Sequence, residues 1–305
     1  MVRGQRAGGA KSKIENRKFY VALLTGAGDK PYALGMAAAL TSVGIHVDFV
    51  GSDDLSVPEL LANPRINFLN LRGDQREDAS ANAKVLRVLK YYARLIGYAA
   101  KAKPKLFHIL WNNKFQLFDC TLLMLYHKLL SKRVVFTAHN VNAGKRDQND
   151  SWLNRILLKV QNSLCDHIFV HTKGMKSEMA SEFGIPESKV CVIPFGINNT
   201  VPNTSLSSAE ARRQLGISSD DKVLLFFGNI APYKGLEYLI AAVSELLTKD
   251  RNYRLLWLES RRARKATGSR FDAPLKAAAS ATASSRRSNM SQTRRPNYIS
   301  KRPTF

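Results

Sequence analysis

The sequence lacks a long apolar run. No stretch of about 18 consecutive apolar residues occurs anywhere in it, so no segment has the composition of a membrane-spanning helix. The first residues, Met1–Lys18, are basic and contain several glycines, but they have none of the apolar centre of a signal peptide. We therefore expect a cytoplasmic protein, with at most a peripheral contact with the inner face of the membrane.

Cysteine is also scarce. The three cysteines, Cys120, Cys165 and Cys191, lie far apart and form no Cys-x-x-Cys pair. This spacing argues against a disulfide scaffold and against a cysteine zinc site. We expect no metal and no cofactor, and we expect all three thiols to be reduced and buried within apolar runs.

Acidic residues are few, 24 against 47 basic ones, which gives a net charge of +23. Segment 260–305 holds 12 of the basic residues and a single acid, Asp272. This Arg-, Ser- and Ala-rich segment has no periodicity, so we predict a disordered tail, and residues 1–18 are predicted to be a disordered basic N-terminus. The charge favours non-specific contact with nucleic acid or anionic membrane, because no motif for specific nucleic-acid recognition accompanies it.

Short apolar runs alternate with segments of helical periodicity through residues 19–200. The first run, Phe19–Thr25, is almost continuously apolar, which is typical of a strand buried on both faces. Further strands are predicted at His46–Gly51, Ile66–Leu71, Leu106–Trp111, Val134–Ala138, His167–His171 and Val190–Pro194, and helices at Pro31–Val43, Ala79–Lys101, Leu117–Leu130, Trp152–Leu164 and Gly174–Phe183. The alternation predicts an α/β, doubly wound Rossmann-like domain, whose ligands bind beyond the carboxyl ends of the strands.

A second unit follows a polar link at Asn198–Ser208. Its predicted elements are helix Ala209–Leu215, strand Val223–Phe227, helix Leu236–Leu247 and strand Tyr253–Leu258. One such passage is too short to cover both faces of a parallel sheet. Residues 201–259 are therefore predicted to be an incomplete second Rossmann-like domain.

Two glycine-containing loops each follow a predicted strand and precede a predicted helix. The first, GAGDKP, could present the backbone at Gly26 and Gly28 to a phosphate, or it could be a tight turn that binds nothing. The second, GNIAPYKG, runs from Gly228 and places Lys234 beside Gly235. A cation and exposed amides at a helix N-terminus make a diphosphate site, although Lys234 could also only cap the turn.

His139 ends the predicted strand VVFTAH, at the ligand edge of the sheet. It could donate a hydrogen bond to a sugar hydroxyl or a phosphate, and a purely structural role is equally compatible. The helical segment Ala83–Lys103 has basic residues on one face. These residues are Lys84, Arg87, Lys90, Arg94 and Lys101. Such a helix can lie on anionic lipid, or it can be a crossover helix with a solvated charged face.

From Phe19 to Leu258 the chain resembles the family 4 glycosyltransferases, which are retaining enzymes of the GT-B fold. The most specific stretch is Asp166–Ala241, with IPFGI before the polar link and GNIAPYKG after it, in the order that the family uses. The resemblance implies two Rossmann-like domains, of which the first binds the acceptor and the second binds a nucleotide-diphosphate sugar. It implies that no metal is needed.

The resemblance also assigns roles to residues. It places Lys234 on the diphosphate-binding lysine, puts Gly26 and Gly28 near the reaction centre, and gives His139 a contact with the donor sugar. Asn229 stands where the family usually has an arginine, which removes one charge that neutralises phosphate.

The family carries two glutamates that hold the donor sugar and its ribose, and none occurs after Glu259. We therefore expect a truncated or frame-shifted member of the family. It would transfer sugar from a nucleotide-diphosphate sugar to a lipid-linked or polysaccharide acceptor with weak or no turnover. The alternative is a non-catalytic glycosyltransferase fragment whose basic tail binds nucleic acid or anionic membrane non-specifically.

Overall fold

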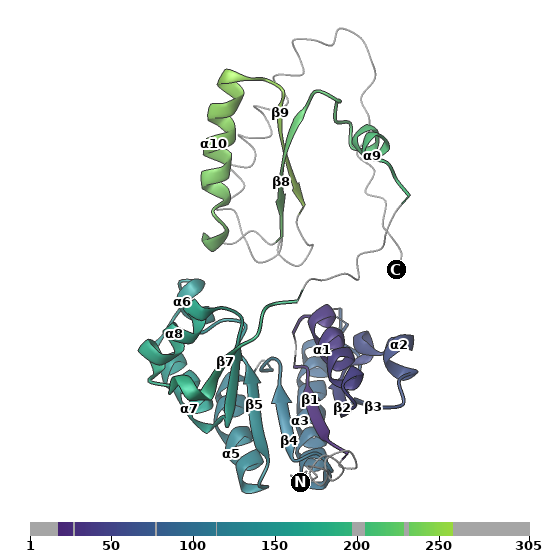
Figure 1. Ribbon diagram of the computed structural model, residues 1–305, viewed down its shortest axis with the longest axis vertical. Helices are drawn as coiled ribbons and strands as arrows, with labels where there is room; N and C mark the ends of the chain where they lie inside the picture. Colours follow the sequence, from purple (N-terminus) through teal and green to yellow (C-terminus); the bar gives the residue numbers. More distant parts are fainter. Residues whose placement is uncertain are drawn as a thin grey trace, which may run out of the picture. The chain divides into compact units, whose positions relative to one another are not determined.

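The computed structural model describes residues 18–26, 28–76, 78–113, 115–196, 205–228 and 232–258. The chain divides into two compact units, residues 1–202 and 203–305 (Figure 1). Apart from Lys18, the two segments predicted to be disordered lie outside the described residues.

Unit 1 is built on a seven-stranded sheet in the order β3-β2-β1-β4-β5-β6-β7, with all neighbouring strands parallel. The strands are β1 Tyr20–Leu24, β2 His46–Gly51, β3 Ile66–Asn70, β4 Leu106–Ile109, β5 Arg133–Thr137, β6 His167–Val170 and β7 Val190–Val192. The strand order changes direction between β1 and β4, and parallel sheets bind ligands at that switch, beyond the carboxyl ends of the strands. The predicted doubly wound α/β sheet is confirmed.

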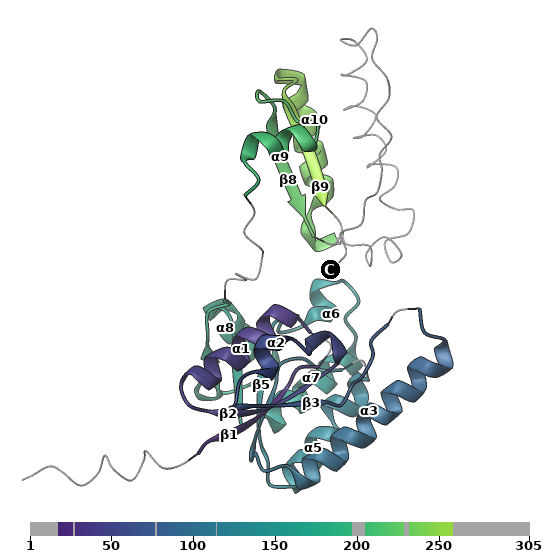
Figure 2. The ribbon, with the colours of Figure 1, turned by 90° about the vertical axis from the view of Figure 1, so that its right-hand side faces the viewer.

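Helices cover both faces of this sheet. They are α1 Lys30–Ser42, α2 Pro58–Leu61, α3 Ala81–Lys101, α4 Gln116–Cys120, α5 Leu122–Leu129, α6 Ala143–Arg146, α7 Trp152–Leu164 and α8 Lys173–Phe183, with 3₁₀ turns at Asp53–Leu55 and Glu187–Lys189. Figure 2 shows α1 and α2 on one side of the sheet and α3 and α5 on the other. Strand β1 serves both faces, because Leu23 packs in the core under α1 while Ala22 and Leu24 pack in the opposite core.

The prediction of a single helix at Leu117–Leu130 is wrong in one respect. The segment forms two helices, α4 and α5, because the backbone of Thr121 leaves the helical region at φ −121° and ψ −86°. The Thr121 hydroxyl donates to the carbonyl of Leu117 at 2.5 Å. A side chain that bonds its own preceding turn competes with regular helix geometry, which explains the break.

The expectation of three buried thiols is also only partly correct. Cys120 and Cys165 are buried, but Cys191 is exposed. It lies on β7, the last strand of the sheet, where Val190 points into the core. Successive side chains of a strand point to opposite faces, so Cys191 points outward.

Helix α3 has an apolar stripe that the body of unit 1 covers only in part. Tyr92, Leu95 and Ala99, in its second half, are buried, whereas Val85 and Leu89 are 60% and 61% exposed. Figure 2 shows the N-terminal end of α3 extending away from the sheet. The stripe therefore continues past the part of the helix that the core covers.

Unit 2 contains a two-stranded parallel sheet, β8 Lys222–Phe227 and β9 Tyr253–Leu258, with helices α9 Ser208–Gln214 and α10 Leu236–Lys249 and a 3₁₀ turn at Pro232–Lys234. All four elements predicted after the polar link are present. Large apolar side chains remain exposed on β8, with Leu225 at 58% and Phe227 at 76%.

Candidate functional site

The switch between β1 and β4 is closed by tight packing of glycine against tryptophan. A Cβ added to Gly26 would lie 2.1 Å from the carbonyl oxygen of Trp111, and one added to Gly28 would lie 1.7 Å from its indole ring. Gly26 also has a positive φ of 57°, which favours glycine. The absence of a side chain at both glycines thus leaves room for Trp111. Their contact with a phosphate stays a prediction.

Trp111 belongs to a cluster of rings at the same edge of the sheet. Its indole stacks on the imidazole of His139 with the centroids 4.0 Å apart and the planes 6° apart. Tyr32 meets both rings edge-on, at 5.4 Å and 4.7 Å. The ring stack holds His139 in one orientation at the end of β5.

His139 is joined to a second histidine that follows β6. Nε2 of His171 lies 3.0 Å from Nδ1 of His139, and Nδ1 of His171 lies 3.1 Å from the carbonyl oxygen of Ile193. Because a carbonyl only accepts, Nδ1 of His171 carries the hydrogen, and in a neutral pair its Nε2 accepts from Nδ1–H of His139. Nε2 of His139 then bears a lone pair. This atom is buried and has no hydrogen-bond partner among the described residues.

Burial, together with the neighbouring His171, lowers the pKa of His139 to about 4. His108 on β4 shares a hydrogen bond of 2.7 Å with Oγ1 of Thr137, and burial lowers the pKa of His108 to about 4 as well. Both imidazoles are therefore neutral near pH 7. A neutral imidazole can bond a sugar hydroxyl, but it adds no positive charge for a phosphate.

A cavity of about 570 Å³ opens beside His139 and lies wholly within unit 1. Trp111, Thr137, His139 and Leu158 contribute to its walls, and the other lining residues include six amides and four apolar side chains. The lining amides are Asn112, Asn113, Gln116, Asn140, Asn149 and Asn154. A pocket of this size holds one or two small rings.

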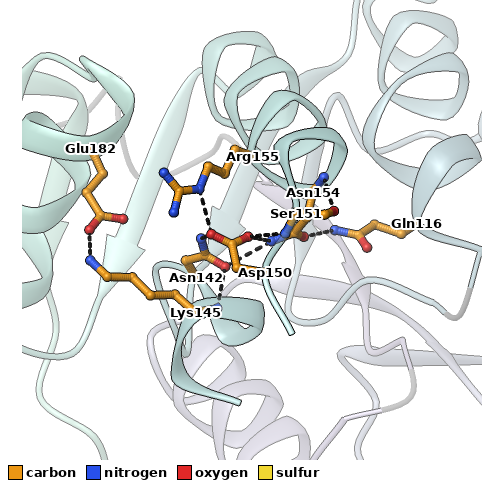
Figure 3. A network of polar contacts seen from close by, with 8 residues as sticks. All are labelled: Gln116, Asn142, Lys145, Asp150, Ser151, Asn154, Arg155 and Glu182. Carbon is orange, nitrogen blue, oxygen red and sulfur yellow. Dashed lines mark hydrogen bonds and ion pairs between the residues drawn. The ribbon is translucent and has the colours of Figure 1, made fainter. Parts of the chain in front are cut away.

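A polar network fixes one wall of this cavity (Figure 3). The carboxylate of Asp150 accepts from Asn142, Asn154 and Arg155 at 3.0, 2.7 and 2.6 Å, and from the backbone N–H of Ser151. The hydrogen bond from Asn154, helped by Arg155 and Asn142, lowers the pKa of Asp150 to about 2. Asp150 is therefore ionised near pH 7, and its carboxylate is satisfied by hydrogen bonds within the network.

In unit 2, Gly228 follows β8, and Lys234 and Gly235 immediately precede α10. A Cβ on Gly228 would lie 3.8 Å from Nζ of Lys234, so the ammonium lies against Gly228. Gly228 and Gly235 have φ values of 125° and 65°, and Gly235 is the N-cap of α10. Asn229 lies outside the described residues.

Among the described residues, no group of three or more His, Cys, Asp or Glu side chains could hold a metal ion. In the same part of the chain, no helix is long and apolar enough to cross a membrane. The predicted site residues fall into two sets, with Gly26, Gly28 and His139 in unit 1 and Gly228, Lys234 and Gly235 in unit 2.

Sequence reasoning missed His171 and the amides of the cavity. His171 ends the run IFVH just as His139 ends VVFTAH, so two histidines at the ends of consecutive strands were the available signal. The amides come from segments far apart in the sequence, with Asn112 after β4 and Asn154 on α7. Only the tertiary structure brings them together.

The sequence profile of Glycosyltransferase Family 4 matches residues 30–200. The chain therefore belongs to this family, as its motifs predict. The match covers the sheet edge that carries His139 and His171.

Two relatives share parts of the sequence. An uncharacterized glycosyltransferase of Methanocaldococcus jannaschii is 41% identical over 81 residues, which are 26% of this chain and 21% of that protein. A D-inositol 3-phosphate glycosyltransferase of Corynebacterium efficiens is 29% identical over 133 residues, 40% of this chain and 31% of that protein. The chain thus aligns with less than a third of either relative.

Solved structures show the same fold. The sucrose-phosphate synthase of Thermosynechococcus elongatus has a TM-score of 0.56 at 19% identity, and the match covers 79% of this chain and 62% of the synthase. The Anabaena protein HepE, solved with UDP and glucose, has a TM-score of 0.54 at 14% identity, and the match covers 90% of this chain and 68% of HepE. The fold class is that of the GT-B glycosyltransferases.

Proposed function

We propose that this chain transfers a sugar, with retention of configuration, from a nucleotide-diphosphate sugar to a glycan or lipid-linked acceptor. The observation that carries the proposal is the loop after β8, where the Lys234 ammonium lies against Gly228 at the N-terminus of α10. Backbone amides, a helix N-terminus and a cation are what a diphosphate leaving group needs. The D-inositol 3-phosphate glycosyltransferases among the relatives and the UDP bound to HepE support a nucleotide-sugar donor.

His139 is proposed to contact the donor sugar. Its neutral ring has an unpaired Nε2 that is buried, and a side-chain adjustment that exposes this atom would let it accept a hydrogen bond from a sugar hydroxyl. The charge that stabilises the departing diphosphate is assigned to Lys234. The two groups thus have separate tasks, one positioning the sugar and the other neutralising the leaving group.

Turnover is proposed to be weak. Residues 260–305 contain no glutamate to match the family's donor-binding pair, and Asn229 replaces the usual arginine. Positioning of reactants contributes as much as ~7–11 kcal/mol to catalysis, so a donor held only by its diphosphate reacts slowly. The alternative of a non-catalytic fragment predicts no transfer at all, and the exposed Leu225 and Phe227 on β8 favour it.

Assays of the purified full chain with UDP- and GDP-sugars separate these functions. Transfer or donor hydrolysis that falls at least tenfold in Lys234→Ala would support the enzyme. Lys249→Ala is the matched control, because this lysine lies at the other end of α10 and pairs with Glu245, at 2.8 Å. A slow activity that Lys234→Ala leaves intact, or that Lys249→Ala reduces equally, would refute the assignment.

We also propose that the uncovered half of α3 lies on the anionic cytoplasmic face of a membrane. Val85 and Leu89 supply exposed apolar area, and the predicted basic face of the same helix supplies charge complementary to acidic lipid. An apolar stripe flanked by cations on one helix is the pattern of an interfacial helix.

Co-sedimentation with phosphatidylglycerol vesicles tests this contact. The double variant Val85→Ser and Leu89→Ser should bind about thirtyfold more weakly, because each side chain contributes roughly 1 kcal/mol of apolar burial at an interface. Leu61→Ser is the control, since Leu61 is 54% exposed on α2. Binding that survives the double variant and disappears when residues 260–305 are deleted would assign lipid binding to the tail.

A further inference from the structure

The described lining of the cavity beside His139 has no cationic side chain. None of its described lining residues is a lysine or an arginine, and its single carboxylate is Asp147. The pKa of Asp147 is lowered by hydrogen bonds from Arg146, so the carboxylate is ionised near pH 7. An anionic ligand in this cavity would therefore have to compete with the Asp147 carboxylate for the neighbouring Arg146.

Nearby cations are already engaged with carboxylates. Arg146 pairs with Asp147 through Nε and Nη2, at 2.6 and 2.8 Å, and its Nη1 donates to Oδ1 of Asn140 at 3.0 Å. Arg155 pairs with Asp150 at 2.6 Å. Lys145, which follows Gly144 in α6, pairs with Glu182 on α8 (Figure 3). Phosphate recognition depends on arginine or lysine directed at the ligand, and each of these cations already has a carboxylate partner.

The lining instead suits hydroxyl groups. An amide offers two N–H donors and a carbonyl acceptor, and a hydroxyl both donates and accepts, whereas a phosphate only accepts. The network around Asp150 holds Asn154 in place, and Gln116 donates to Asn154 at 2.8 Å. The indole of Trp111 adds an apolar wall, against which the C–H face of a saturated ring can pack.

We infer that this cavity is the acceptor subsite and that it takes a neutral polyhydroxylated ring, a sugar or cyclitol, in preference to its phosphorylated form. The inference rests on the proposed transferase function and deepens it by naming the class of acceptor. It sets this chain apart from the relatives named for D-inositol 3-phosphate. The acceptor enters next to His139, which lines the same cavity.

Ligand-observed NMR titrations of the full chain test the inference with a matched pair of probes, myo-inositol and myo-inositol 3-phosphate, and with glucose as a second neutral ring. At least one neutral ring should bind at least tenfold more tightly than the phosphate. Asp147→Asn removes the like charge and releases Arg146 while keeping the side-chain shape. It should shift the preference about tenfold toward the phosphate.

Glu187→Gln is the matched control, because it releases Lys176 from an ion pair at 3.6 Å outside the cavity lining. It should leave the preference unchanged, and thermal melts establish that each variant is folded. Equal or tighter binding of the phosphate by the unmodified chain, or no detectable binding of any neutral ring, would overturn the inference. Binding of UDP, measured separately, shows whether the proposed transferase function has failed instead.

Discussion

Removing His171 tests how the sheet edge fixes the chemical form of His139. The His171→Leu variant takes away the acceptor for Nδ1–H of His139, which lies 3.0 Å from Nε2 of His171. A buried donor left without a partner costs about 1–3 kcal/mol of stability. The proton of His139 would no longer be held on Nδ1, so both tautomers become populated.

The assay is heteronuclear NMR of the imidazole nitrogens at pH 7, where the pKa of about 4 keeps His139 neutral. In the unmodified chain the proton should be on Nδ1, and in His171→Leu a signal for protonated Nε2 should appear. His171→Gln is the conservative variant, because its amide oxygen can accept the same hydrogen bond and should restore the Nδ1 form. Protonated Nε2 in the unmodified chain would refute the reasoning.

Two other predictions concern packing and pH. Gly28→Ala should destabilise unit 1 by about 1–3 kcal/mol in chemical denaturation, because its Cβ would overlap the Trp111 ring. A Cβ added to Gly35 would have no atom within 4 Å, so Gly35→Ala should stabilise helix α1 by up to about 1 kcal/mol. Equal effects of the two variants would contradict this packing. Acidification should also destabilise unit 1: the folded-state pKa values of His108 and His139 are about 4, below the ordinary 6.5, so the unfolded chain binds more protons between these values. Their contribution is on the order of 3 kcal/mol for His108 and less for the partly exposed His139, where water screens the charge. It is complete above pH 6.5 and is lost as the pH falls to 4, and a flat melting temperature across this range would oppose it.

The sequence predicted the architecture well because its signal is local. Continuous apolar runs such as Phe19–Thr25 predicted parallel strands, and the structure places every predicted strand of unit 1 in one sheet. The errors arise where tertiary context decides. The break at Thr121 depends on a side-chain hydrogen bond, and the exposure of Cys191 depends on its position at the edge of the sheet.

The site was predictable only in part. His139 and Lys234 follow strands and could be found from the rule that ligands bind at strand ends. The partner of His139 is 32 residues away in the sequence, and the separation between Asn112 and Asn154 is larger still. No periodic pattern in the sequence predicts the packing of Trp111 on Gly28. Such contacts depend on loop conformation, which apolar periodicity does not encode.

Calorimetric titration of the full chain with UDP and with UMP tests the central claim most directly. The account predicts that UDP binds at least tenfold more tightly than UMP, because only UDP offers a diphosphate to Lys234 and the N-terminus of α10. Lys234→Ala should abolish this difference and leave UMP binding unchanged. Equal affinities for UDP and UMP, or a preference for UDP that Lys234→Ala preserves, would contradict it.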